Sequence, residues 1–328
     1  MARDNYLFSG SSFGRAEQCA PFAALPWVDT TSRYAQEGTD THGFLELVAA
    51  GVDRDAALAL TPENVRGVCE RIDVSQVPRG LVEPSMALDP RTGLARFTGT
   101  RRRRYDVRPY EIPMTPDVIV SDGVTDGDDL TRWLEGATFA TVGDWKRTFY
   151  DRDTVYDEPQ LAINCLSTAA ITGLTTIGWF VGKINDDGGI DFINGEFNAN
   201  DLAAIARRVR RAVAAVERER AKAAELGASY VPDVFGGHHC NYCPAFVSCP
   251  RTRATLRAVF EHGTELTERA AGAAYPMVQT VERWAEAARE VIKQYVKAHG
   301  DAETGDGRYV TLDGRGSLKL KRLKNAGE

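Results

Sequence analysis

Phe139-Ala-Thr-Val-Gly-Asp144-Trp145-Lys146 is an apolar run that ends in an aspartate and a lysine. The run has the length and composition of a buried strand. Alternate side chains of a strand share a face, so Val142, Asp144 and Lys146 are expected to point together. Buried unpaired charges cost several kcal/mol, so the two charged side chains must pair, reach solvent or bind a ligand.

A second carboxylate precedes the neighbouring apolar run, in Pro116-Asp117-Val118-Ile119-Val120. If these runs are adjacent strands, Asp117 and Asp144 can converge on one Mg²⁺ or Mn²⁺ ion. Such an ion, together with the ammonium group of Lys146, would stabilise the charge that develops when a phosphodiester is hydrolysed. Asp122 is an alternative to Asp117, because a shift in strand register separates them.

The remaining sequence predicts an α/β fold, with a mixed sheet flanked by helices. Helical spacing and capping residues predict helices from Ser11 or Ser12 to about Leu25, and over 33–50, 53–60, 63–72, 158–170, 200–226 and 252–299. Asn200 is the expected N-cap of the sixth helix, and Gly272 and Pro276 are expected to interrupt the last. Strands are predicted over 118–120, 137–145, 175–183 and 190–193, and hairpins from 81–88 with 94–98 and from 309–312 with 317–320.

Composition limits the classes of protein to consider. The chain has 328 residues, of which 43% are hydrophobic, and a formal net charge of −6. No apolar run is long enough to span a membrane and the N-terminal residues lack a signal-peptide pattern, so we expect a cytoplasmic protein with no membrane partner. Because the net charge is negative, any contact with nucleic acid must be local, and Arg101, Arg102, Arg103 and Arg104 form one basic run that could make it.

Three of the six cysteines crowd into one loop, at Cys240, Cys243 and Cys249. Their C-x2-C-x5-C spacing, in a chain expected to be reduced, indicates a metal site. A structural Zn²⁺ completed by His238 or His239 is one possibility. Cys69 and Cys165 lie in apolar surroundings and are expected to be core residues.

The order of these motifs resembles the PD-(D/E)xK nuclease superfamily, through Asp117 and the Asp144-Trp145-Lys146 triplet. The segment Gly38-Thr-Asp-Thr-His42-Gly-Phe-Leu-Glu46 and Gln160 resemble motifs of its RecB-like branch. The resemblance implies a restriction-endonuclease-like core in which His42, Asp117, Asp144 and the Trp145 carbonyl hold the cation and Gln160 lines the site. Glu46, one helical turn after His42, could orient the imidazole. The sequence departs from the family where a tyrosine usually follows the glutamine by four residues, because Asn164 stands there.

One early cysteine and three late ones resemble the iron–sulfur nucleases of the CRISPR-associated and AddB-type groups. This resemblance implies a [4Fe–4S] cluster bound by Cys19, Cys240, Cys243 and Cys249. It also implies a nuclease domain over residues 1–255, followed by a C-terminal helical extension over 256–328. The implied function is a Mg²⁺- or Mn²⁺-dependent deoxyribonuclease, an exonuclease acting on single strands or DNA ends, with a helicase or recombination protein as a partner. The alternative is a non-catalytic DNA-binding or assembly module that keeps the fold and the cluster.

Overall fold

The computed structural model describes residues 6–27, 33–101, 105–123, 132–146, 158–185, 187–233, 238–240, 243–246, 248–252, 254, 257, 267–304, 308–313 and 317–322. The chain forms two compact units. Unit 1 comprises residues 1–26 and 34–235, and unit 2 comprises residues 27–33 and 236–328. The candidate catalytic residues all belong to unit 1.

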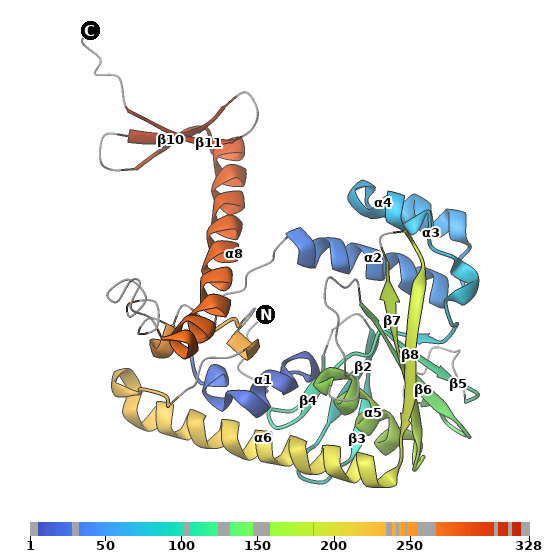
Figure 1. Cartoon of the computed structure of the whole chain (residues 1–328). Helices are drawn as coiled ribbons and strands as arrows, with labels where there is room; N and C mark the ends of the chain where they lie inside the picture. Colours follow the sequence, from blue (N-terminus) through green and yellow to red (C-terminus); the bar gives the residue numbers. More distant parts are fainter. Residues whose placement is uncertain are drawn as a thin grey trace. The chain divides into compact units, whose positions relative to one another are not determined.

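A mixed five-stranded sheet forms the centre of unit 1 (Figure 1). Its order is β1 (Leu81–Val82), β5 (Val118–Ser121), β6 (Ala140–Lys146), β7 (Ile177–Ile184) and β8 (Ile190–Phe197). Neighbouring strands are antiparallel except β6 and β7, which are parallel. The prediction of an α/β protein with a mixed sheet is therefore confirmed.

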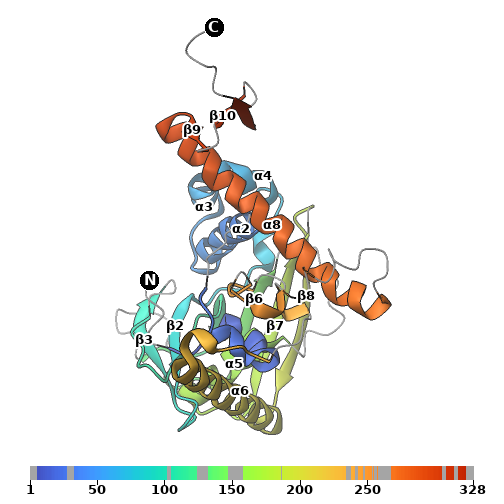
Figure 2. The same ribbon diagram turned by 90° about the vertical axis from the view of Figure 1, so that its left-hand side faces the viewer.

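Three helices pack together beside the sheet, namely α2 (Arg33–Ala49), α3 (Arg54–Leu60) and α4 (Glu63–Cys69) (Figure 2). Their apolar side chains form one core cluster with Trp145 and Phe180 of the sheet. Asp53 caps α3 by accepting hydrogen bonds from the N–H groups of Asp55 and Ala56. The three helices were predicted from apolar spacing and capping residues, and all three are present.

Two further helices of unit 1 are α5 (Pro159–Thr172), which contacts β6 and β7, and α6 (Ala199–Leu226), which contacts α5 and the N-terminal helix α1 (Phe13–Gln18) (Figure 1). The N-cap of α6 is Asn198, two residues before the predicted one. The Asn198 side chain accepts hydrogen bonds from the N–H groups of Asn200 and Asp201, and Asp201 accepts one from the Asn198 N–H. This reciprocal box fixes the start of the helix.

The N-terminal helical segment is shorter than predicted. The helix α1 (Phe13–Gln18) ends at Cys19, and the 3-10 helix η2 (Ala20–Ala23) follows. Pro21 has no N–H to continue the α-helical hydrogen bonds, which explains the break. Arg208 of α6 holds α1 in place through two hydrogen bonds to the Glu17 carboxylate, each 2.8 Å long.

The predicted strand 81–88 is two strands in different sheets. After β1, the backbone of Glu83 turns with a φ of +43°, and β2 (Pro84–Leu88) joins a second sheet. That sheet has the order β3 (Ala95–Arg101), β2, β4 (Ile112–Met114). The β2–β3 hairpin was predicted, whereas the short β4 was not.

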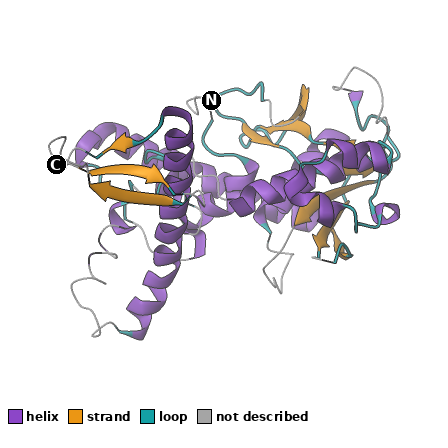
Figure 3. Ribbon diagram, turned by 90° about the horizontal axis from the view of Figure 1, so that it is seen from above, coloured by secondary structure: helices purple, strands orange, loops and turns teal. Residues whose placement is uncertain are grey.

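Unit 2 contains the 3-10 helix η7 (His238–Cys240), the long α8 (Glu268–His299) and a three-stranded sheet. The sheet pairs β9 (Ala302–Glu303) and β11 (Leu318–Arg322) with β10 (Arg308–Leu312), and Figure 3 shows β10 and β11 side by side. This confirms the predicted C-terminal hairpin. The predicted interruptions at Gly272 and Pro276 are wrong, because α8 continues through both residues. The proline removes one backbone hydrogen bond of the helix. The residues around it include several good helix formers, which favour continuation of the helix. Among the described helices, none combines the length and apolarity needed to cross a membrane.

Candidate active site

The register of β5 and β6 places the two predicted carboxylates opposite each other. Val118 pairs with Gly143, so the preceding Asp117 lies across from Asp144 at the same end of the ladder. A side chain at Gly143 would overlap the ring of Phe180, so glycine permits the tight packing next to the site. Asp117 is 6% exposed and Asp144 is 1% exposed. Two buried carboxylates at one strand end carry a large desolvation cost unless cations or hydrogen bonds compensate it.

Asp117 contacts the Trp145 N–H and the imidazole of His42. Its Oδ2 accepts a hydrogen bond of 2.7 Å from the Trp145 N–H and lies 3.6 Å from His42 Nδ1. Burial raises the pKa of the Asp117 carboxyl above its usual value, and the Asp144 carboxylate adds to this shift. The charges of His42 and Lys146 and the Trp145 N–H oppose it. A divalent cation would favour the ionised form in the same way.

Lys146 pairs with Asp144. Its Nζ lies 2.7 Å from Asp144 Oδ2, which confirms that the two side chains share a face of β6. The contact brings the ammonium charge of Lys146 against the buried carboxylate of Asp144. Lys146 is 32% exposed at its side chain and can therefore reach a ligand from solvent.

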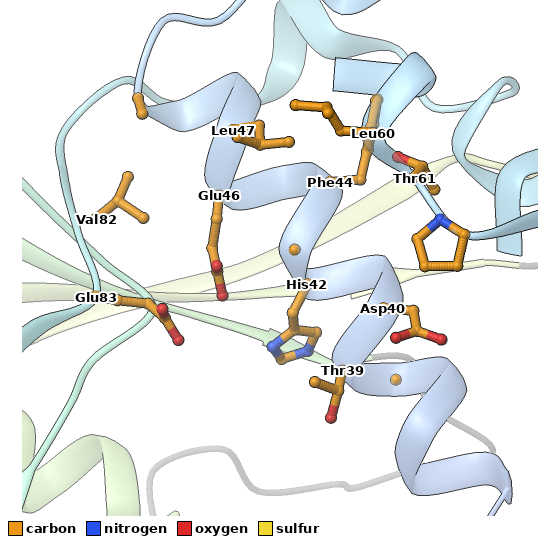
Figure 4. Close-up of a pocket in the computed structure, with 14 residues that line it drawn as sticks. Thr39, Asp40, His42, Phe44, Glu46, Leu47, Leu60, Thr61, Val82 and Glu83 are labelled. Carbon is orange, nitrogen blue, oxygen red and sulfur yellow. The ribbon is translucent and has the colours of Figure 1, made fainter. Parts of the chain in front are cut away.

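His42 and Glu46 of α2 face a pocket of about 790 Å³ (Figure 4). They lie one helical turn apart on one face, as predicted from their spacing. The wall across the pocket includes Val82 and Glu83 from the end of β1. The His42–Asp117 contact links this pocket to the carboxylates of β5 and β6.

Glu83 is a pocket residue that the sequence analysis missed. It is 8% exposed, and its N–H donates a hydrogen bond of 3.1 Å to the Asp117 carbonyl oxygen. The acidic residue inside an otherwise uncharged run, 80–88, was the signal available. A buried acid in such a run carries the same desolvation cost as Asp144, so this glutamate, like Asp144, is expected to pair, reach solvent or bind a ligand.

Asp122 lies past the other end of β5, away from Asp144. Its carboxylate is exposed and accepts hydrogen bonds from the side chain and N–H of Thr138 and from the N–H of Phe139. These bonds, with that of the Thr138 hydroxyl first, lower the pKa of Asp122. Asp122 therefore stabilises the segment around Thr138 through its hydrogen bonds, and Asp117 is the carboxylate that lies next to Asp144.

Three other predictions about the site stay untested by the described contacts, namely those for Gln160, the Trp145 carbonyl and the run from Arg101 to Arg104. Gln160 is the second residue of α5 and half-buried, and the described contacts do not join it to Asp117, Asp144 or Lys146. The Trp145 carbonyl remains a predicted ligand, while its N–H holds Asp117. Arg101 is the last residue of β3, and Arg102, Arg103 and Arg104 lie outside the described residues.

One family model matches part of the chain, over residues 200–325. Its description is a protein of unknown function, DUF2800. The match begins after every candidate catalytic residue and covers nearly all of α6 and most of unit 2, including the three loop cysteines. No curated protein and no solved structure matches the chain.

The four cysteines predicted to bind iron are divided between the units. Cys19 follows α1 in unit 1, and Cys240, Cys243 and Cys249 belong to unit 2. The Cys243 N–H donates a hydrogen bond to the Cys240 carbonyl oxygen, and the Phe246 N–H donates one to the Cys243 carbonyl oxygen. Cys69 and Cys165 are fully buried, as predicted, and burial raises the pKa of the Cys165 thiol.

Within the described part of the chain, no group of three or more His, Cys, Asp or Glu side chains has the spacing of a formed metal site. The candidate cation ligands of unit 1 instead meet in pairs, as the imidazole of His42 with the carboxylate of Asp117, and the carboxylate of Asp117 with that of Asp144. Their chemistry fits a hard divalent cation, because carboxylate oxygen and imidazole nitrogen both bind Mn²⁺, and carboxylate binds Mg²⁺.

Proposed function

We propose that this protein is a Mg²⁺- or Mn²⁺-dependent deoxyribonuclease with a restriction-endonuclease-like core of the RecB type. The observation that carries the proposal is the meeting of Asp117 and Asp144, buried and opposed on neighbouring strands, with the ammonium group of Lys146. Two buried acids beside one lysine make poor structural stabilisers, since their desolvation cost exceeds what one ion pair returns. They make a suitable cation site, since a divalent ion offsets both charges.

Each group has a part in hydrolysis of a phosphodiester. Asp117 and Asp144 would hold the cation, with His42 on the Asp117 side. The bound cation would polarise the phosphate and lower the pKa of the attacking water. Lys146 stands beside Asp144 and would orient that water or offset charge on the phosphate as the bond to the leaving oxygen breaks.

The substrate and the remaining cofactor follow from resemblance. DNA, cleaved from single strands or ends, is the proposed substrate, and Arg101 to Arg104 are proposed to line its path. A [4Fe–4S] cluster bound by Cys19, Cys240, Cys243 and Cys249 is proposed to link distant parts of the chain and so stabilise the fold. Zn²⁺ is the alternative metal. A helicase or recombination protein is the proposed partner.

The test is hydrolysis of end-labelled single-stranded and duplex DNA by the full chain in Mn²⁺. Lys146→Ala should lower the rate at least about 100-fold, the size of effect seen when one preorganised charge-stabilising group is removed. Lys222→Ala is the matched control, because Lys222 pairs with Glu219 on the surface of α6. Equal rates for wild type and Lys146→Ala would refute the catalytic assignment. A wild type that binds DNA without cleaving it would instead favour the non-catalytic module.

A further inference from the structure

A second lysine lies beside the candidate active site, on the strand next to β6. The strand β7 lies between β6 and β8 in the central sheet (Figure 1), and its ladder with β6 pairs Lys183 with Lys146. The same ladder pairs Val181 with Asp144, two positions earlier on both strands. Because alternate residues of a strand share a face, Lys183 lies on the face of the sheet that carries Asp144 and Lys146.

Both lysines lie at the carboxyl ends of their strands. Lys146 is the last residue of β6, and Lys183 is the last but one of β7. The two strands are parallel, and α5, which lies between them in the sequence, contacts both. Their carboxyl ends therefore lie at the same edge of the sheet, where α/β proteins commonly bind their ligands.

No residue that the structure describes neutralises Lys183. Its side chain is half-buried, and it has no hydrogen bond or ion pair within the described part of the chain. The carboxylate opposite it, in the ladder with β8, is that of Asp191. Asp191 Oδ2 instead accepts a hydrogen bond of 2.9 Å from the side chain of Asn185. The Lys183 ammonium group is thus left for a ligand.

Two lysines at paired positions of neighbouring strands do not stabilise a sheet. Like charges directly opposite each other in a ladder destabilise it. The Asp144 carboxylate, 2.7 Å from Lys146 Nζ, compensates Lys146, whereas none of the described carboxylates compensates Lys183. A bound anion would offset the charge of Lys183, and ammonium N–H groups are suitable donors to phosphate oxygens.

We propose that Lys183 binds a backbone phosphate of the DNA next to the phosphate that is cleaved, an assignment that rests on the proposed nuclease function. Neighbouring strands lie about 4.7–4.9 Å apart, and consecutive phosphates of one DNA strand advance by about 3.4 Å along its axis. Long side chains on adjacent strands can therefore reach consecutive phosphates, Lys146 the scissile one and Lys183 its neighbour. Lys183 is a substrate-binding residue, because the phosphate that it contacts does not react.

The kinetics should separate the two lysines. A contact to an unreactive phosphate is equally strong before and during the reaction, so its loss raises KM and leaves kcat unchanged. Lys183→Gln should raise the KM for single-stranded DNA about tenfold with kcat within about twofold of wild type. Lys146→Ala should instead lower kcat. A fall in kcat with an unchanged KM in Lys183→Gln would overturn the assignment.

DNA binding tests the contact without hydrolysis. Fluorescence anisotropy of a labelled single-stranded oligonucleotide, with Ca²⁺ in place of Mn²⁺, gives the Kd of the full chain at a series of salt concentrations. Lys183→Gln should weaken binding about tenfold and reduce the slope of log Kd against log salt by about 0.7, the contribution of one phosphate contact on a single strand. Lys222→Gln removes the same charge from the surface of α6 and should change neither quantity.

Lys183→Arg separates the charge from the packing of the side chain. Arginine also donates to phosphate, so this variant should keep most of the wild-type affinity and the wild-type salt slope. Equal losses of affinity in Lys183→Arg and Lys183→Gln would overturn the assignment, as would a wild-type Kd and slope in Lys183→Gln or a wild type that does not bind DNA. A wild type whose DNA binding depends on Lys183 but that cleaves no DNA in Mn²⁺ would contradict the proposed hydrolysis alone.

Discussion

Glu83 has a backbone conformation that side-chain-bearing residues rarely adopt, with a φ of +43°. The left-handed region costs a residue with a Cβ about 1–2 kcal/mol. The strain occurs where the chain leaves the main sheet and directs a carboxylate into the pocket. Strain of this kind is retained where the surrounding structure, or a function, demands it.

At residue 83, the variant with glycine should be more stable than the variant with alanine, which is the reverse of the usual order. We predict that Glu83→Gly unfolds with a free energy about 1 kcal/mol higher than Glu83→Ala in metal-free buffer, because glycine carries no penalty at positive φ. Urea denaturation of both variants measures the difference. At Arg210, an exposed position in the middle of α6, the same two replacements should show the ordinary order, with the glycine variant less stable by about 1 kcal/mol. Alanine more stable than glycine at both positions would mean that Glu83 is unstrained.

At the scale of elements, a buried acid joins β3 to the loop before β4. Glu111 is 3% exposed and accepts hydrogen bonds from Arg96 of β3, at 3.2 and 2.8 Å, and from the Arg108 N–H, at 2.9 Å. Burial alone would raise the pKa of Glu111, but the hydrogen bonds and charges of Arg96 and Arg108 outweigh it and lower the pKa. A lowered pKa in the folded state stabilises the protein above the unfolded pKa, and this stability is lost as the pH falls through the folded value.

Glu111→Gln should therefore have two effects. At neutral pH it should lower the free energy of unfolding by about 2 kcal/mol, the worth of hydrogen bonds to a charged group. Below about pH 5, where unfolded glutamates begin to protonate, wild type should lose stability more steeply than the variant. Denaturation at a series of pH values gives both quantities. Parallel curves for the two proteins would show that Glu111 is not ionised by this network.

The helix α5 contains a polar residue that its surroundings do not satisfy. Asn164 is 1% exposed, and neither atom of its amide has a hydrogen-bond partner among the described residues. Leucine has a similar volume and no polar group to leave unpaired. We predict that Asn164→Leu raises the free energy of unfolding by about 1–2 kcal/mol.

The control for this change is Asn194→Leu, at an exposed position of β8, where the effect should be within about 0.5 kcal/mol. Thermal or urea unfolding compares the two. A loss of stability in Asn164→Leu would show that the amide has a partner outside the described residues.

At the scale of the whole molecule, the proposed cluster would be bound by Cys19 and by three cysteines far from it in the sequence, Cys240, Cys243 and Cys249. Anaerobically purified protein should be brown and contain about four iron atoms per chain. Cys240→Ser should lose most of the iron and lower the thermal stability, because a link between distant parts of the chain restricts the unfolded state. Cys165→Ser, at a buried core position, should keep the iron. One zinc atom and no iron in the purified protein would support the alternative metal.

The sequence predicts those features of the fold and the candidate site that neighbouring residues determine, and it does not predict those that depend on contacts between distant parts of the chain. Alternation along residues 139–146 was enough to place Asp144 and Lys146 on one face, and apolar spacing with caps was enough for the helices near His42. Asp117 and its alternative Asp122 could be separated only by the strand register, which is set by packing across the sheet. The pairing of Val118 with Gly143 supplies that information.

Glu83 could not be placed for a different reason. A left-handed backbone is usually marked in sequence by glycine or asparagine, and here a glutamate adopts it within a run that reads as one strand. The start of α6 was missed by two residues, because Asn198 and Asn200 are both good caps and only the box with Asp201 distinguishes them. These errors arise where tertiary contacts decide between locally equivalent choices.

The most direct test of the central claim measures Mn²⁺ binding and DNA hydrolysis together in wild type and Asp144→Asn. Asparagine keeps the size of the side chain and removes the charge that faces Lys146 and the proposed cation. If Asp117 and Asp144 hold the catalytic ion, Asp144→Asn should bind that ion more weakly by at least about tenfold and lose hydrolysis in parallel. Undiminished Mn²⁺ affinity and wild-type cleavage in a folded Asp144→Asn protein would contradict the account.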